Sequence, residues 1–153
     1  MPLMAVEIPR LSQLETATQD DIAFAIDYER RLRALSQSDV TSAKPQLLEI
    51  VYSQKADARL RYSTALCLLR SGSPLTYEEM SRAAAVGYAI SMARDQARAN
   101  SLLFFFLSHL PKGAQAEDVQ KTMATHGWSV DQATVAKSLS GLAGKKLPIS
   151  FIE

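Results

Sequence analysis

The sequence predicts a mainly α-helical, globular protein, and three observations carry this prediction. Apolar residues recur at intervals of three and four along most of the chain, the spacing that gives a helix one apolar face. Helix-start and helix-stop signals separate these stretches. Only residues 147–152, LPISFI, have the composition of a strand. With 47% apolar and 22% charged residues, the 153-residue chain can bury a sizeable core.

The first predicted helix covers residues 19–36. Thr18 and Asp21 resemble a helix start, because side-chain oxygens at such positions cap free backbone amides. The apolar stripe of this helix, which we expect to be buried, is Ile22, Ile26, Leu32 and Leu35. Its charged face, which we expect to be solvated, is Glu29, Arg30, Arg31 and Arg33.

Two further helices are predicted before residue 75. Residues 36–39, SQSD, indicate a loop, and Pro45 suits the first turn of the helix that follows. The apolar face of that helix is Leu47, Leu48 and Val51. The next helix, over residues 56–71, ends at SGSP, residues 71–74. Its apolar side is Leu60, Thr64, Cys67 and Leu68.

The middle of the chain predicts two closely packed helices. Thr76 and Glu79 form a capping box, and the helix that they open carries small residues that let another helix approach. These small residues are Ala83, Ala84, Gly87 and Ser91. The next helix, over residues 94–110, contains LLFFFLSHL, which is apolar on nearly every face and is the predicted centre of the core. Pro111 and Gly113 end it.

A short helix is predicted over residues 116–125, with Val119 and Met123 on its buried side. His126 caps its C-terminal end, and Gly127 takes the left-handed conformation that such a cap requires. Trp128 then folds back on Met123, the apolar contact that accompanies this type of cap. The chain is therefore expected to turn tightly at this point.

A second short helix, over residues 130–143, follows directly. Ser129 and Gln132 form its predicted capping box. Its core-facing residues, by helical spacing, are Val135, Leu139 and Leu142. Two short helices joined by a tight, glycine-containing turn after a longer apolar helix predict a helix-turn-helix.

On this arrangement, residues 94–153 resemble the winged-helix superfamily of bacterial regulators. The order of residue types carries the resemblance: Ala133-Thr134-Val135, Lys137, Leu139 and Leu142, then Gly144-Lys145-Lys146 and Leu147. The resemblance implies a recognition helix and at most a short, degenerate wing, because Lys146 stands where that family usually has glycine. We therefore divide the chain into a helical region, residues 1–93, and a winged-helix-like unit, residues 94–153.

The resemblance implies a DNA-binding transcriptional regulator that reads the major groove with its second short helix. The residues expected to face outward to the bases are Gln132, Thr134, Lys137 and Ser138, and those expected to contact phosphates are Lys112, Lys121, Lys145 and Lys146. The charge is small for such a footprint, because residues 111–153 hold five lysines against four acidic residues. All ten arginines lie at or before Arg98, so the commonest base-reading side chain is absent from this region.

An all-helical protein-interaction module, such as an adaptor, a chaperone or a secretion-associated protein, is the alternative. The two hypotheses differ at the second short helix. A basic, convex face exposing Gln132, Thr134 and Lys137 would favour DNA, whereas an apolar groove there would favour a partner helix. In the DNA hypothesis we expect a homodimer formed through the N-terminal helices, because two weak half-site modules then act together.

The sequence contains no motif that indicates another class of function. There is no glycine-rich phosphate loop, no HExxH and no nucleophile elbow, and Cys67 is the only cysteine, so we expect no enzyme, cofactor or metal site. His109 and His126 suit structural positions in a buried helix and at a helix end. Because the N-terminus MPLMAVEIPR does not resemble a secretory signal and no apolar run is long enough to cross a bilayer, we expect a cytoplasmic protein.

Overall fold

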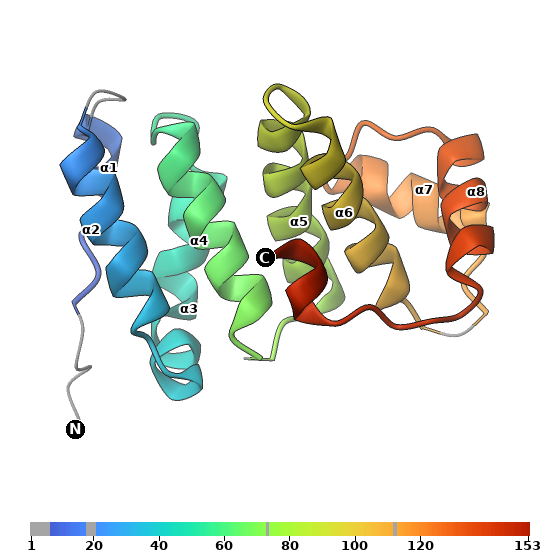
Figure 1. Ribbon diagram of the computed structural model, residues 1–153, viewed down its shortest axis with the longest axis horizontal. Helices are drawn as coiled ribbons and strands as arrows, with labels where there is room; N and C mark the ends of the chain where they lie inside the picture. Colours follow the sequence, from blue (N-terminus) through green and yellow to red (C-terminus); the bar gives the residue numbers. More distant parts are fainter. Residues whose placement is uncertain (1–6, 18–20, 73, 112) are drawn as a thin grey trace. The chain divides into compact units, whose positions relative to one another are not determined.

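A computed structural model describes residues 7–17, 21–72, 74–111 and 113–153, and the regular secondary structure of this part of the chain is entirely helical (Figure 1). It contains eight α-helices, one short 3-10 helix and no strand. The prediction of a mainly α-helical protein is therefore confirmed. The chain folds as two compact units, Met1–Leu75 and Thr76–Glu153, which are described in turn.

The first unit is built around α4. Its helices are α1 (Leu11–Thr16), α2 (Ile22–Arg33), α3 (Gln37–Tyr52) and α4 (Ala58–Arg70). α4 packs against both α2 and α3, and α1 packs against α3 (Figure 1). The predicted apolar side of α4 is confirmed, since Leu60, Thr64, Cys67 and Leu68 are all buried.

The buried face of α2 differs from the predicted one. Ile22 and Ile26 are 57% and 50% exposed, whereas Ala25, Tyr28 and Leu32 are buried. The buried hydroxyl group of Tyr28 shares a 2.6 Å hydrogen bond with Thr64 Oγ1 on α4. This bond satisfies the hydroxyl group and so allows the large ring to enter the core. The predicted burial of Ile22 and Ile26 was therefore wrong.

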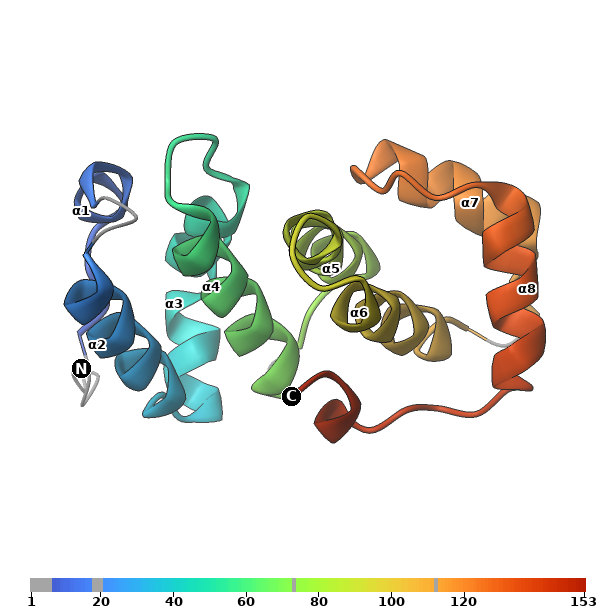
Figure 2. The same cartoon turned by 45° about the horizontal axis from the view of Figure 1, so that its top comes forward.

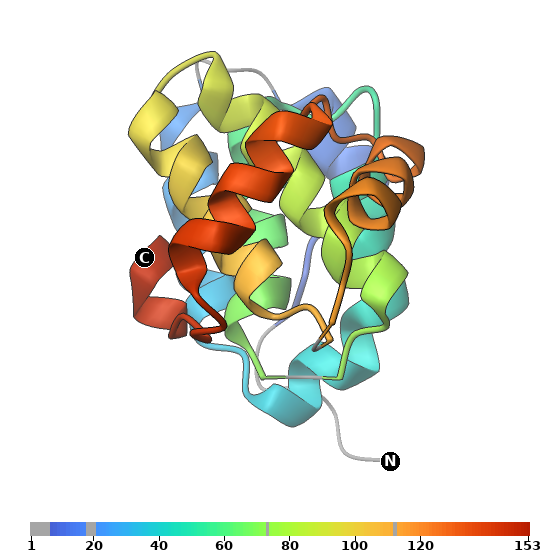
Figure 3. The same cartoon turned by 90° about the vertical axis from the view of Figure 1, so that its right-hand side faces the viewer.

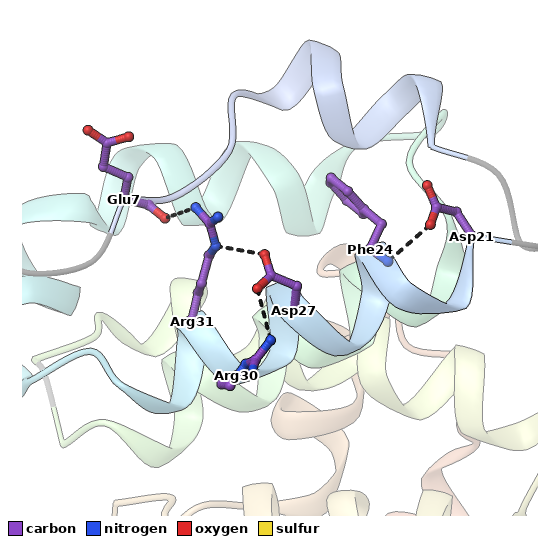
Figure 4. Close-up of polar contacts among 6 residues, drawn as sticks. All are labelled: Glu7, Asp21, Phe24, Asp27, Arg30 and Arg31. Carbon is purple, nitrogen blue, oxygen red and sulfur yellow. Dashed lines mark hydrogen bonds and ion pairs between the residues drawn. The ribbon is translucent and has the colours of Figure 1, made fainter.

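The charged face of α2 is organised around Asp27 (Figure 4). Asp27 accepts hydrogen bonds from Arg30 at 3.2 Å and from Arg31 at 2.8 Å, and Arg31 also donates to the backbone carbonyl of Glu7 at 3.2 Å. Asp21 caps the helix by accepting from the Phe24 amide. The other half of the predicted start signal, Thr18, lies outside the described residues.

α3 begins earlier than the sequence indicates. Ser36 and Asp39 form a capping box, so the segment read as a loop is in fact the first turn of the helix. Pro45 consequently lies inside α3 rather than in its first turn. A proline there removes one backbone hydrogen bond, but its ring is exposed, and the buried face is intact. That face consists of Val40, Ala43, Leu47, Ile50 and Val51.

The second unit is built around α6. Its elements are α5 (Tyr77–Met92), α6 (Gln96–Ser108), α7 (Ala116–Thr125), α8 (Gln132–Leu142) and the 3-10 helix η1 (Ile149–Ile152). α6 packs against α5, α8 and η1, while α7 packs against α8 (Figure 2). The boundary between units falls before α5, whereas the sequence predicts it after residue 93. Extensive packing of α5 on α6 joins α5 to the C-terminal elements.

The core of this unit follows the predicted pattern. The capping box of Thr76 and Glu79 opens α5, and all four small residues of its stripe are buried. Five apolar side chains of α6 are also buried: Leu102, Leu103, Phe105, Phe106 and Leu107. Trp128, which follows α7, stacks on Phe106 with the ring centroids 5.3 Å apart. Its indole N–H donates to the Ser81 carbonyl oxygen at 2.9 Å and lies 3.1 Å from Ser81 Oγ.

The turn between α7 and α8 confirms the predicted C-terminal cap. The Trp128 amide donates to the Met123 carbonyl and the Gly127 amide to the Ala124 carbonyl, the pair of bonds of a Schellman motif. Gly127 has a φ of 98°. The predicted start of α8 was wrong, because Asp131 rather than Ser129 caps it and accepts from the Thr134 amide at 2.7 Å.

Residues 147–152 do not form the predicted strand. Pro148 precedes a single 3-10 turn whose hydrogen bonds are local, such as that from the Phe151 amide to the Pro148 carbonyl at 3.0 Å. The part of the chain that the structure describes offers no strand for this segment to pair with. Ile152 is buried, and η1 packs on α6.

Candidate functional site

The predicted recognition helix is α8, and its four proposed base-reading residues differ in their exposure to solvent. Gln132, Thr134 and Lys137 are exposed, as expected. Ser138 is only 8% exposed, so its predicted outward position was wrong. It lies three residues after the fully buried Val135 and therefore on the same face of the helix.

A cavity of about 550 Å³ lies between α8, α6 and the C-terminal segment. We call it the α6–α8 groove. Figure 3 shows α8 at the front of the view, with the C-terminal segment beside it. Ten residues line the groove: Asn100, Leu103, Phe104, Thr134, Lys137, Ser138, Gly141, Leu142, Leu147 and Phe151. Three of the four predicted base-reading residues thus belong to the wall of a groove.

The apolar lining of the groove comes from three segments. Leu103 and Phe104 belong to α6, Leu142 to α8, and Leu147 and Phe151 to the C-terminal segment. Phe151 is 41% exposed, and Phe104, Leu142 and Leu147 are half-buried. These side chains leave apolar surface in contact with solvent, and a ligand could bury it.

Gly141 keeps the groove open on the α8 side. No heavy atom lies within 4 Å of the position that a Cβ atom would occupy at this residue. A glycine within a helix costs up to about 1 kcal/mol relative to alanine, and Gly141 lies in the last turn of α8. The absent side chain therefore leaves space in the groove wall at some expense to the stability of α8.

The C-terminal wall of the groove is anchored at Leu147. The Leu147 amide donates to Ser108 Oγ at 3.0 Å, and its carbonyl oxygen lies 3.0 Å from Nε2 of His109. Burial lowers the pKa of His109 below its ordinary value; the bond to the Leu147 carbonyl opposes this effect, and the charge of Lys146 adds to it. The neutral imidazole is thereby favoured, and with Nε2 protonated it donates to the carbonyl.

The charge of the groove is positive. Lys137 is the one charged residue among the ten that line it. Lys145 and Lys146, two of the predicted phosphate contacts, are exposed in the turn that leads from α8 to Leu147. A third, Lys121, lies on α7 and pairs with Glu117 at 3.1 Å, away from the groove lining. Lys112 lies outside the described residues.

Asp131 places a negative charge at the start of α8. Its carboxylate is exposed, and hydrogen bonds from the side chain and backbone of Thr134 hold its pKa below the ordinary value. It therefore stays ionised at neutral pH. A carboxylate at this end of the helix would face the phosphates of a DNA duplex in a recognition-helix geometry.

A second cavity, of about 360 Å³, lies in the first unit. It is bounded on one side by α2 and on the other by the segment that leads into α1. Its lining includes Glu7, Arg10, Asp27 and Arg31. Arg31 is already bonded to Asp27 and to the Glu7 carbonyl (Figure 4). Since positive and negative groups balance within it, this cavity favours no class of ligand as clearly as the α6–α8 groove does.

Most groove residues were not identified from the sequence. The missed residues are Asn100, Leu103, Phe104, Gly141, Leu147 and Phe151. Two signals were available: a glycine inside the predicted helix of residues 130–143, and the aromatic run of residues 104–106, which is too apolar for a single neighbouring helix to cover.

No protein-family model, curated protein or solved structure matches this chain. Across the residues that the structure describes, acidic, cysteine and histidine side chains nowhere gather in a group of three that could hold a metal ion. None of the described helices has the length and apolar character needed to cross a membrane. The function proposed for the chain therefore rests on the geometry of the groove.

Proposed function

We propose that the protein is a helical protein-interaction module that binds an apolar segment of a partner in the α6–α8 groove. One observation carries the proposal: three of the four α8 residues expected to read DNA line a groove whose other walls are mostly apolar side chains. Thr134 and Lys137 stand at this groove, and Ser138 is buried in its wall.

The size and composition of the groove suit such a partner. A volume of about 550 Å³ accommodates several apolar side chains, and each large one contributes about 1.5–3 kcal/mol when fully buried. The loss of translational and rotational freedom on association opposes this gain with at least about 4 kcal/mol. We therefore expect a modest affinity, and the titration that tests it should extend to about 1 mM.

Gly141→Leu is the sharpest test, because its side chain starts in open space at the groove wall. The glycine is helical and nothing lies within 4 Å of an added Cβ atom, so leucine should raise helix stability by up to about 1 kcal/mol while occupying the site. Ala136→Leu is the matched control, since it adds the same side chain to an exposed position of α8 outside the groove lining.

The readout is fluorescence anisotropy of a labelled, designed helical peptide with leucines at positions i, i+3, i+4 and i+7. We expect the unsubstituted protein and Ala136→Leu to bind it equally and Gly141→Leu to bind at least about tenfold more weakly, as expected when one large apolar contact of about 1.5 kcal/mol is lost. Equal binding by all three proteins would refute the proposal.

DNA binding is the second candidate, and the exposure of Gln132, Thr134 and Lys137 on the second helix of the α7–α8 pair favours it. The test is anisotropy of mixed-sequence duplex DNA at low and at near-physiological salt. Binding through phosphates weakens steeply with salt, and Lys137→Glu should abolish it with the fold intact. Absence of binding at low salt would remove this candidate, and with it the proposed homodimeric regulator.

A further inference from the structure

We infer that the partner segment is an amphipathic α-helix whose polar face carries acidic side chains. The inference rests on the proposed function and specifies the chemistry of the partner at the same groove. Two independent features support it: the backbone of the groove walls, which determines the conformation of the partner, and the charge around the groove, which determines its polar face.

The walls of the groove offer few free backbone groups to an extended peptide. Two of the walls are the helices α6 and α8, whose backbone groups bond within each helix. The third is the C-terminal segment, where Leu147 contacts the groove. Both backbone groups of Leu147 are engaged, the amide by Ser108 and the carbonyl by His109, each at 3.0 Å.

An extended partner would therefore bury its own amides and carbonyls against apolar side chains without hydrogen bonds. Unpaired buried backbone groups cost free energy comparable to that of a lost hydrogen bond each. A helical partner satisfies its backbone internally and presents one apolar face to the groove. The anchoring of Leu147 thus favours a helix over an added strand.

The lysines around the groove are available to an acidic ligand. Lys137 lines the groove, and Lys145 and Lys146 follow the end of α8. None of these three lysines forms an ion pair with a residue that the structure describes, whereas Lys121 on α7 is paired with Glu117. The ten residues that line the groove include no carboxylate.

Three acidic residues of this unit cap the N-termini of helices. Glu79 belongs to the capping box of α5, Asp95 caps α6 and Asp131 caps α8, so three carboxylates are committed to helix N-termini. Because Lys137 is the one charged residue among those that line the groove, a bound acidic side chain would meet a positive charge there. Charge complementarity of this kind selects the partner and speeds its association.

The test compares two designed peptides with the same leucine positions and with either glutamate or lysine at the polar positions. Binding is measured by anisotropy at low and at near-physiological salt. We expect the glutamate peptide to bind about tenfold more tightly at low salt, since each exposed ion pair contributes up to about fivefold and three lysines are available. The difference should shrink as salt is added.

Lys137→Glu should reduce or reverse the preference for the glutamate peptide. Lys121→Glu is the matched control, since it introduces the same charge change on α7 outside the groove lining. A glutamate peptide with a central proline, which disrupts its helix, should bind at least about tenfold more weakly, because interior proline costs a helix about 3 kcal/mol.

The failures of the two proposals are distinguishable. If Gly141→Leu weakens both peptides but the two bind equally well, the groove binds apolar segments and the acidic part of the inference is overturned. If the proline peptide binds as tightly as its parent, the helical part is overturned. If Gly141→Leu changes neither binding curve, the proposed function itself fails.

Discussion

His109 holds Leu147 in place: its Nε2 lies 3.0 Å from the Leu147 carbonyl oxygen, at the point where the C-terminal segment returns to α6. The neighbouring Ser108 accepts a hydrogen bond from the amide of the same residue. Two adjacent side chains at the end of one helix therefore fix both polar backbone groups of a single residue, and the groove wall depends on that residue.

We predict that His109→Ala loosens the C-terminal segment without unfolding the helices. Loss of one partly buried hydrogen bond costs about 1 kcal/mol, which corresponds to a fall in melting temperature of about 2–4 °C for a chain of this size. Trypsin should cleave at the exposed Lys145 and Lys146 faster than in the parent protein. His126→Gln, which alters the other histidine, should leave this cleavage rate unchanged.

Lowering the pH should loosen the same segment. Because burial lowers the pKa of His109 below 6.5, His109 takes up a proton more readily when release of the segment exposes its imidazole to water. The stabilisation is complete above pH 6.5 and is lost as pH falls below it. Tryptic cleavage is too pH-dependent to report this, so amide exchange of Leu147 should be followed from neutral to mildly acidic pH. His109→Gln should remove this histidine-dependent step, and a step of the same size in that variant would contradict the assignment.

Trp128→Phe should destabilise the second unit by about 1–3 kcal/mol. The substitution removes the indole hydrogen bonds to Ser81 and part of the ring that packs on Phe106, and the two losses together cost about that much. Ser81→Ala removes only the hydroxyl and should cost less. Trp128 is the only tryptophan, so urea unfolding should be followed by far-ultraviolet circular dichroism rather than by fluorescence. A loss no larger than that of Ser81→Ala would contradict the prediction.

Two glycine-to-alanine substitutions should have opposite effects on stability. Gly127 has a φ of 98°, so alanine there is strained and should cost about 1–2 kcal/mol. Gly141 is helical and nothing lies within 4 Å of an added Cβ atom, so alanine there should stabilise by up to about 1 kcal/mol. Thermal unfolding of the two variants side by side measures both, and a shift of the same sign in both would contradict the assigned conformations.

Tyr28→Phe should destabilise the first unit by about 1 kcal/mol, because it removes the buried hydrogen bond to Thr64. Thr64 still donates to the Leu60 carbonyl at 2.7 Å, so its hydroxyl is not left unpaired. Burial raises the pKa of Tyr28 above its ordinary value of 10, so stability should also fall as pH rises through 10. In Tyr28→Phe, the loss of stability at alkaline pH should be smaller by the part that ionisation of Tyr28 contributes. An equal loss of stability in the two proteins would contradict this prediction.

Local signals predicted the elements that depend on a few neighbouring residues. The capping box of Thr76 and Glu79 and the glycine turn at Gly127 are examples, because a cap needs only side chains within three or four positions of the helix end. The end of α7 at Thr125 follows from the same glycine turn, whereas no side chain caps its start. Where competing caps lay close together, as at Ser129 and Asp131, the choice between them was wrong.

Faces and partners were harder to predict, because they depend on residues far away in the chain. Helical spacing alone favours Ile22 and Ile26 as core residues of α2, but Tyr28 is buried because Thr64, 36 residues later, pairs with its hydroxyl. The segment of residues 147–152 has strand composition but no strand beside it within the described residues. The groove combines residues 100–104 with residues 134–151, so no single short stretch of sequence could reveal it.

The double anchor at Leu147 also determines how mechanical force would enter this unit. Tension applied beyond Glu153 would peel η1 from α6 and then load the two hydrogen bonds at Leu147, while α8 and the turn before Leu147 remain slack. When those bonds break, Leu147 and Phe151 leave the groove together. Under tension, the C-terminal segment would thus detach before any α-helix unfolds.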